Sequence, residues 1–157
     1  MKNKVLVIGL GDIGMLYDYK LSGDFILSHC KAFSAHKDFN LCGAVDPDKK
    51  KHNLFKQTFN KPVYLSVSEA LTLIKPNIVV IATPSGSHLK VINEVLDNTK
   101  PDLILCEKPL DYDLNDAENI INRCNADKVP IFVNYIRKSH EGSNIIKNMI
   151  DNDKICP

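Results

Sequence analysis

Three glycines follow directly on the first apolar run of the chain. Residues 5–8 are apolar and open into Gly-x-Gly-x-x-Gly, with Gly9, Gly11 and Gly14 at its fixed positions. In such a motif the first glycine makes a tight turn after a buried strand, the second lets the backbone approach a pyrophosphate, and the third permits close packing. Free N–H groups where the following helix starts, around Asp12 and Ile13, would hold the phosphates. The spacing therefore predicts a dinucleotide site, with an ordinary glycine-rich turn as the alternative.

A candidate ligand for the ribose hydroxyls ends the next apolar segment. Residues 39–45 form this segment, and Asp46 follows it. A carboxylate at this point accepts hydrogen bonds from the ribose of NAD and repels the 2′-phosphate of NADP. NAD is therefore the expected cofactor and NADP the less favoured one. The basic run 49–51 is the one feature that argues against a strict preference for NAD. Because Pro47 comes next, a turn-initiating Asp-Pro pair is the other interpretation of Asp46.

The spacing between these two features indicates an insertion. Asp46 lies 32 residues after Gly14, whereas the motif usually places the acid about 20 residues on. Residues 15–24 show no sustained helical period, while the apolar residues between Ile26 and Phe33 fit an amphipathic helix. We predict that the first crossover helix begins near Asp24, and that the residues before it form a loop over the cofactor site.

Strands and helices alternate along the rest of the chain. The apolar runs predict strands at 62–65, 78–82, 103–106 and 131–133. Helices are predicted at 49–59, from a cap at Ser66 or Ser68 to residue 74, at 87–96 and 115–124, and around 145–150. This alternation predicts an α/β fold with a doubly wound parallel sheet, a Rossmann fold, in a chain of one-domain length.

Two further motifs follow the predicted strands at 78–82 and 103–106, at the sheet edge where such folds bind ligands. They are Thr-Pro-x-x-x-His, from Thr83 to His88, and Glu107-Lys108-Pro109. Together with the glycine motif and Asp46, they make residues 3–137 resemble the Gfo/Idh/MocA family of NAD(P)-dependent sugar oxidoreductases. Glu-Lys-Pro is the most specific element of this resemblance.

The resemblance implies that Lys108 is the catalytic residue. In the family the lysine of Glu-Lys-Pro lies near the nicotinamide and the reacting carbon of the sugar. Its role would be to donate a hydrogen bond or a proton to the oxygen whose charge changes during hydride transfer. Glu107 is expected to contact the nicotinamide ribose or to pair with Lys108, and the Lys108–Pro109 bond is expected to be cis.

Other positions receive roles from the same resemblance. Thr83 and Pro84 are expected to line the cofactor pocket. His88 is expected either to contact a ligand or to cap or pack the next helix, and His29 to be structural. The positions that the family commonly places near the substrate are Asn134, Tyr135 and Arg137.

Family members continue into a second α/β domain that supplies most of the sugar pocket. We expect residues 1–138 to form the dinucleotide-binding Rossmann domain and residues 139–157 to begin the link to such a substrate domain, which is absent from this chain. The expected activity is NAD-dependent hydride transfer on a sugar, nucleotide sugar or polyol. The alternative is a non-catalytic NAD-binding module or a truncated remnant. Without the companion domain we expect NAD binding without sugar dehydrogenase turnover, and exposed apolar surface that could support a homo-oligomer.

Composition excludes several other classes. With 20 basic and 19 acidic residues, the chain has a formal charge of +1 and no electrostatic footprint for nucleic acid. The basic run 49–51 is interpreted as the solvated start of a helix. No segment approaches the roughly 18 apolar residues of a membrane span, and no signal peptide is evident, so a cytoplasmic location is expected. Five cysteines without a C-x-x-C pair predict neither a disulfide framework nor a metal site.

Overall fold

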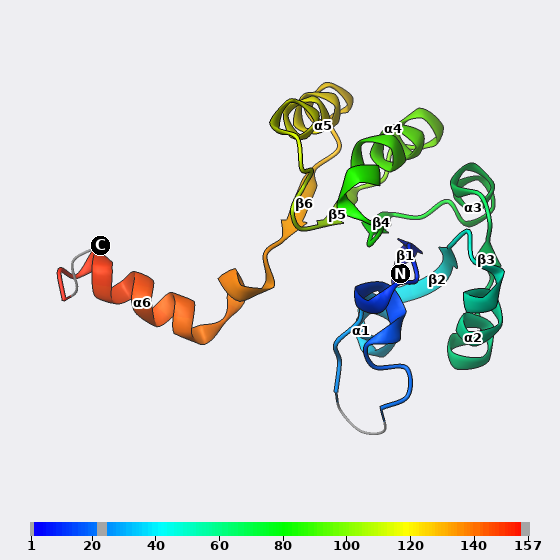
Figure 1. Ribbon diagram of the computed structural model, residues 1–157, viewed down its shortest axis with the longest axis horizontal. Coiled ribbons are helices and arrows are strands. Elements are labelled where there is room, and N and C mark those ends of the chain that lie inside the picture. Colours follow the sequence, from blue (N-terminus) through cyan, green and yellow to red (C-terminus); the bar gives the residue numbers. More distant parts are fainter. Residues whose placement is uncertain (1, 22–24, 155–157) are drawn as a thin grey trace.

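A six-stranded sheet forms the centre of the computed structural model, which describes residues 2–21 and 25–154 (Figure 1). The strands pair in parallel in the order β3-β2-β1-β4-β5-β6. Their bounds are β1 Asn3–Ile8, β2 Phe39–Val45, β3 Val63–Tyr64, β4 Ile78–Ile81, β5 Leu103–Glu107 and β6 Ile131–Asn134. The strand order reverses between β1 and β4, which is the switch point where open α/β sheets bind ligands. The predicted doubly wound parallel sheet is confirmed.

Helices cover both faces of this sheet because its central strands are apolar on both sides. On one face, Leu6 and Ile8 of β1 pack with residues of α3 (Val67–Ile74), α4 (His88–Asn98) and α5 (Leu114–Asp127). On the other face, Val5 and Val7 pack with residues of α1 (His29–Ala35) and α2 (Lys49–Phe59). Figure 1 shows these two helix layers on opposite sides of the strands. The alternating side chains of one strand therefore hold the two hydrophobic cores together.

The predicted start of the first crossover helix was wrong. Asp24 itself lies outside the described residues, but α1 begins only at His29, after the N-cap Ser28. The buried Asp18 carboxylate accepts hydrogen bonds from the backbone N–H groups of Leu27 (2.6 Å) and Ser28 (2.9 Å) and from the Ser28 hydroxyl (2.5 Å). Because these bonds fix the chain just before the cap, the helix cannot extend further toward the N-terminus.

Part of the predicted loop over the site is also helical. Residues Asp12–Leu16 form a single π-helical turn (η1), and the Met15 side chain of this turn is fully buried. The glycine motif thus opens into a short helical turn, and residues 17–20 continue it as turns.

The other elements lie close to their predicted positions. Ser66, rather than Ser68, caps α3 by accepting a hydrogen bond from the Glu69 N–H. A 3₁₀ turn, η2 (Ser85–Ser87), precedes α4, and α5 runs three residues beyond its predicted end at Cys124. Three helices end in non-glycine residues with left-handed backbone: α2 at Asn60, α3 at Lys75 and α5 at Lys128.

The last described segment leaves the sheet. After β6, a 3₁₀ turn, η3 (Ile136–Ser139), leads into α6 (Glu141–Asp151), which projects away from the rest of the molecule (Figure 1). None of the α6 residues is buried, and Ile145 and Ile146 are more than half exposed.

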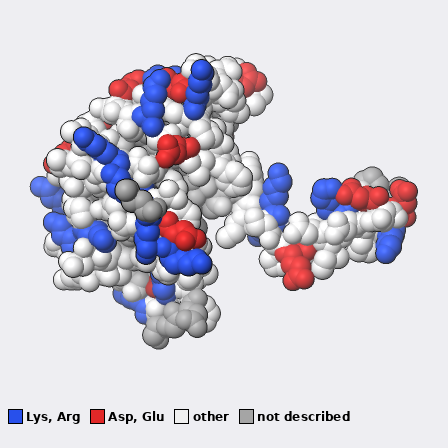
Figure 2. Space-filling view, turned by 180° about the vertical axis from the view of Figure 1, so that it is seen from behind, with Lys and Arg blue, Asp and Glu red and all other residues white. Residues whose placement is uncertain are grey.

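Within the described residues, no helix has the length and apolar character that a membrane span needs. Basic and acidic side chains are interspersed on the face that Figure 2 shows. Cys30, Cys106 and Cys124 are buried and Cys42 is partly buried, each as a free thiol. Cys156 lies outside the described residues.

Two glycines of the motif occupy positions where a Cβ atom would collide with the backbone. Gly9 has φ +97°, and a Cβ there would lie 2.6 Å from the Ala82 carbonyl oxygen. A Cβ on Gly14 would lie 2.1 Å from the carbonyl oxygen of Gly9. A Cβ on Gly11 would meet nothing within 4 Å. Gly9 and Gly14 therefore set the local packing, whereas Gly11 faces open space.

This difference predicts that Gly14→Ala destabilises the fold by about 1 to 3 kcal/mol, because backbone atoms would have to move to admit the methyl group. The matched variant Gly11→Ala should lower the unfolding free energy by less than about 1 kcal/mol, since only a helix-cap preference changes. Urea denaturation followed by circular dichroism measures both. Equal losses in the two variants would contradict the packing role of Gly14.

Candidate functional site

A cavity of about 930 Å³ opens at the carboxyl edge of the sheet. The segments after β1, β2, β4 and β5 form its walls, so the topology alone brings these distant parts of the chain together. Most of the residues predicted to bind the cofactor line it: Gly9, Gly11, Asp12, Ile13, Asp46, Thr83, Pro84, Glu107 and Lys108. Its volume is that of a typical small-molecule or cofactor site.

The glycine turn presents backbone N–H groups to the cavity. The N–H groups of Met15 and Leu16 bind the Gly11 carbonyl oxygen at 2.8 and 3.0 Å, and that of Tyr17 binds Asp12 at 3.0 Å. The N–H groups that precede them belong to the first turn and have no acceptor within it. Because Gly11 and Asp12 line the cavity, this turn can donate hydrogen bonds to a pyrophosphate.

Asp46 lies beside the glycine turn in the cavity wall and is 3% exposed. Its Oδ2 accepts hydrogen bonds from the Leu10 N–H at 2.8 Å and from the Lys51 ammonium at 3.0 Å. Its Oδ1 accepts one from the Asp48 N–H at 2.8 Å. The carboxylate therefore faces the cavity and also organises the turn into α2. Both interpretations of the sequence, ribose ligand and turn former, fit this position.

Glu107 and Lys108 join the first cavity to a second one of about 470 Å³. Ile13 also borders both. The second cavity is completed by the residues predicted to lie near a substrate, together with one neighbour: Asn134, Tyr135, Ile136 and Arg137. The two cavities thus meet at the Glu-Lys-Pro loop. The expected cis bond between Lys108 and Pro109 is confirmed.

The Glu107 carboxylate is held by two side chains. Its Oε1 lies 2.7 Å from Nε2 of His29, and the Asn134 amide donates to the same oxygen at 2.6 Å. Burial raises the pKa of Glu107, but the hydrogen bonds from His29 and Asn134 outweigh it and keep the pKa below its usual value. Glu107 is therefore ionised at neutral pH and fixed where the cavities meet.

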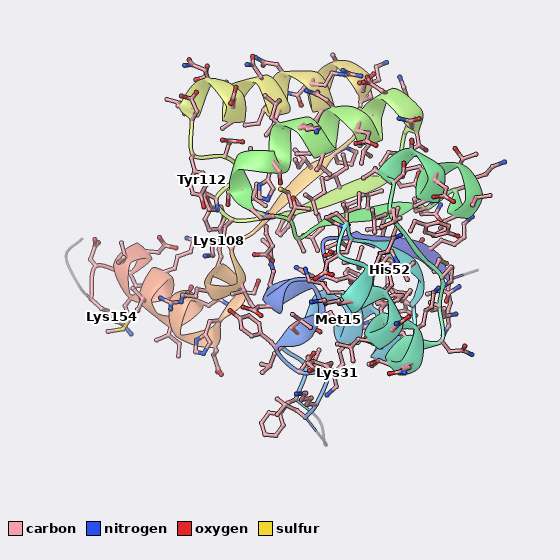
Figure 3. All side chains as sticks on the ribbon, turned by 45° about the vertical axis from the view of Figure 1, so that its right-hand side comes forward. Met15, Lys31, His52, Lys108, Tyr112 and Lys154 are labelled. Atoms are coloured by element: carbon pink, nitrogen blue, oxygen red, sulfur yellow. The ribbon has the colours of Figure 1, made fainter. Side chains whose placement is uncertain are left out.

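Lys108 is exposed and extends from the same loop. In Figure 3 it lies between the loop that carries Tyr112 and the helical segment after β6. Because Lys108 borders both cavities, its ammonium can reach a group bound in either one.

His88 and Gly14 lie beneath the site instead of in its wall. His88 was among the predicted cofactor contacts, but its side chain is 0% exposed and does not line the first cavity. Its ring nitrogens lie 2.9 Å from the Leu110 carbonyl oxygen and 3.0 Å from that of Thr83. The packing role, the other expectation for His88, fits this geometry: the ring ties the loop after β4 to the loop after β5.

Sequence reasoning missed two contacts of the site. The basic run 49–51 was interpreted as solvated, yet Lys51 reaches back five residues to Asp46 and lines the cavity. The available signal was a lysine in the first turn of the predicted helix that follows the acid. The bond between His29 and Glu107 joins residues 78 positions apart. No local pattern indicates it, and His29 was assigned only a structural role.

Comparisons with known proteins agree with this architecture. Residues 3–135 match the family model described as "Oxidoreductase family, NAD-binding Rossmann fold". A comparison with curated protein sequences found no match.

Among solved structures, the chain is similar to the WlbA dehydrogenase of Bordetella pertussis in complex with NADH and UDP-GlcNAcA, with 20% identity and a TM-score of 0.82, over 97% of this chain and 42% of that one. It is also similar to scyllo-inositol dehydrogenase of Lactobacillus casei with NAD(H) and scyllo-inositol, with 19% identity and a TM-score of 0.81, over 99% of this chain and 42% of that one. A third is myo-inositol 2-dehydrogenase of Lactobacillus plantarum, with 16% identity and a TM-score of 0.81, over 99% and 42%. At these identities the likeness establishes the fold alone, and the chain spans less than half the length of each structure.

The contacts of Glu107 predict the effect of removing His29. In His29→Ala the carboxylate loses one hydrogen bond and a cationic neighbour while burial remains, so the pKa of Glu107 should rise. Because the folded-state pKa of Glu107 is lowered, its contribution to stability is present above about pH 4.5 and disappears as the pH falls through the folded value. The stability difference between wild type and His29→Ala should therefore shrink as the pH falls below about 4.5 through the lowered pKa of Glu107.

Carbon-detected NMR titration of the glutamate carboxyls measures the shift. His36→Ala is the matched control, because the His36 ring lies beside the exposed carboxylate of Asp38 instead of Glu107. An unchanged Glu107 titration in His29→Ala would contradict the assigned contact.

Proposed function

Because the chain belongs to the Gfo/Idh/MocA oxidoreductase family, whose NAD-binding Rossmann domain matches residues 3–135, we propose that it is the NAD(H)-binding part of an enzyme that transfers hydride to or from a sugar, nucleotide sugar or polyol. The observation that carries the proposal is the junction of two cavities at Glu107 and Lys108. One cavity has the features of a dinucleotide site. The other is lined by Asn134, Tyr135 and Arg137 beside two isoleucines, Ile13 and Ile136.

Residues of this chain fit the cofactor along the first cavity. The glycine turn has open space at Gly11 and N–H groups for the pyrophosphate. Asp46 would receive the ribose hydroxyls on the adenine side. The remaining length of the cavity leads to Thr83, Pro84 and Glu107, which would surround the nicotinamide side.

Lys108 has the position required of the catalytic group. Nicotinamide supplies the acceptor or donor of hydride when it is bound. The Lys108 ammonium would donate a hydrogen bond or proton to the substrate oxygen as the carbonyl gains charge. When an alcohol is oxidised, the neutral Lys108 amine would accept the proton of the alcohol. Glu107, held by His29 and Asn134, would fix the neighbouring backbone and ribose.

The second cavity supports a polyhydroxylated substrate. Asn134, Tyr135 and Arg137 offer amide, hydroxyl and guanidinium groups to it. Two of the similar structures hold scyllo-inositol and UDP-GlcNAcA, respectively. A polyol or nucleotide sugar is therefore the class of substrate proposed for this chain's enzyme.

Residues 1–138 would form the dinucleotide-binding unit, and 139–157 the link to a substrate-binding domain. The similar structures extend well beyond the part matched by this chain. The described part of the proposed link, residues 139–154, includes α6, in which no residue is buried. The exposed isoleucines of that helix are available for contact with such a domain.

Calorimetric titration should show that NAD(H) binds more tightly than NADP(H), because Asp46 repels a 2′-phosphate. Asp46→Ala should weaken NAD binding by about 1 to 3 kcal/mol, the usual effect of losing buried hydrogen bonds to a charged group. Since Asp46 also holds two backbone N–H groups, circular dichroism must confirm that the variant is folded. Asp38→Ala, at an exposed carboxylate, is the control. Tighter binding of NADP(H) by the wild type would overturn the assignment.

The orientation of the cofactor is tested at Ile13, which borders both cavities. With methyl-labelled isoleucine and bound NAD⁺, NMR should show nuclear Overhauser effects between the nicotinamide protons and the Ile13 methyl group. The adenine protons should instead contact methyl groups of Leu65 or Val67, which line the Asp46 end of the cavity. The reverse pattern would place nicotinamide away from Lys108 and remove its catalytic role.

A further inference from the structure

Lys51 forms an ion pair with Asp46, the carboxylate proposed to bind the ribose. Its ammonium lies 3.0 Å from Oδ2 of Asp46, and both residues line the large cavity. The Lys51 side chain is 27% exposed, so it is neither locked in the core nor free in solvent. The next residue, His52, places Nε2 2.6 Å from the Asp46 carbonyl oxygen. Figure 3 shows His52 on α2. The start of α2 is thus bound to Asp46 through both backbone and side chain.

The hydrogen-bonding capacity of Asp46 is nearly used up. A carboxylate offers about four acceptor positions. The N–H groups of Leu10 and Asp48 occupy two of them and Lys51 a third. A ribose diol brings two hydroxyl donors, so one more position is needed than is free. The two backbone donors are fixed by the fold, whereas the Lys51 side chain has rotatable bonds and partial access to solvent. The donor that can leave is therefore Lys51.

The charge of this pair also differs from that of a lone aspartate. An isolated carboxylate repels a 2′-phosphate, which carries roughly two negative charges at neutral pH. Here a lysine ammonium lies in direct contact with the carboxylate, on the wall that the 2′ position would face. An ammonium that leaves the carboxylate can bind phosphate oxygens as a point charge with three donors.

We propose that Lys51 is a specificity-determining residue that allows the site to accept NADP(H) beside NAD(H), by moving from Asp46 to the 2′-phosphate. NAD(H) remains the tighter ligand because Asp46 is still present, but the difference between the two cofactors is small. This inference rests on the proposed dinucleotide site. Lys49 and Lys50 take no part, since neither lines the cavity.

The test compares dissociation constants of the full 157-residue chain for NAD⁺ and NADP⁺, and for the fragments 5′-AMP and 2′,5′-ADP. Lys51→Met removes the ammonium and keeps a long side chain. It should raise the ratio of the NADP⁺ to the NAD⁺ dissociation constant about tenfold or more, the usual effect of losing a charged hydrogen bond. The fragments should show the same change, since they differ only in the 2′-phosphate. NAD⁺ binding should be unchanged or tighter, because an acceptor position of Asp46 becomes free.

Two further variants keep the test decisive. Lys51→Arg retains the charge and should retain NADP⁺ binding, which separates loss of charge from damage to the fold. Lys50→Met removes one charge from the neighbouring position and should leave the ratio within about twofold, because an exposed charge outside the cavity is screened. An equal change in the ratio for Lys50→Met and Lys51→Met would overturn the inference, as would a wild type that binds NAD⁺ but no NADP⁺. Failure of the wild type to bind either nucleotide would overturn the proposed dinucleotide site as well.

Discussion

The buried carboxylate of Asp46 joins the glycine turn to the segment between β2 and α2, and both of these line the large cavity. It receives the Leu10 N–H from the glycine turn and the Asp48 N–H from the start of α2, and it ends β2 itself. Without it, backbone donors at this wall would lose their acceptor, at about 1 to 3 kcal/mol for each buried group left unpaired. In the proposed dinucleotide site the same oxygens would also receive the ribose, so folding and ligand binding would depend on one group.

Glu107 has a comparable position at the other end of the site. His29 comes from α1 on one face of the sheet and Asn134 from the end of β6, and both bind the same carboxylate oxygen. Glu107 and Asn134 are paired neighbours on β5 and β6, whereas His29 belongs to the helix after β1, which is two strands away from β5 in the sheet order. The loop with Lys108 is consequently supported from both sides, while Lys108 itself stays exposed. The proton transfer proposed for Lys108 would then need no movement of the backbone.

The parts of this structure that follow from local chemistry were predictable from the sequence. The strands buried on both faces, such as β1 and β4, are continuous apolar runs, and the glycine and Glu-Lys-Pro motifs mark the ends of strands. The start of α1 was not predictable, because Ile26 and Leu27 imitate a helical stripe although each is 51% exposed. The Asp18 carboxylate, nine residues earlier than Leu27, overrides that pattern through hydrogen bonds. The role of His88 was not predictable either, because a histidine after a strand can contact a ligand or pack in the core. Only the fold shows that both ring nitrogens of His88 lie beside carbonyl oxygens of the protein.

The left-handed residues that end α2, α3 and α5 place backbone strain at one edge of the sheet. Each of these helices ends just before the next strand begins, at the edge of the sheet opposite the cavities. Asn60, Lys75 and Lys128 adopt there a backbone conformation that costs most side chains about 1 kcal/mol or more. This strain lies away from the cavities. Beside the cavities, the close packing at Gly9 and the hydrogen bond from Leu10 to Asp46 fix the backbone of the glycine turn. A substitution at one of these helix ends can therefore change the stability of the fold without touching the groups that line the cavities.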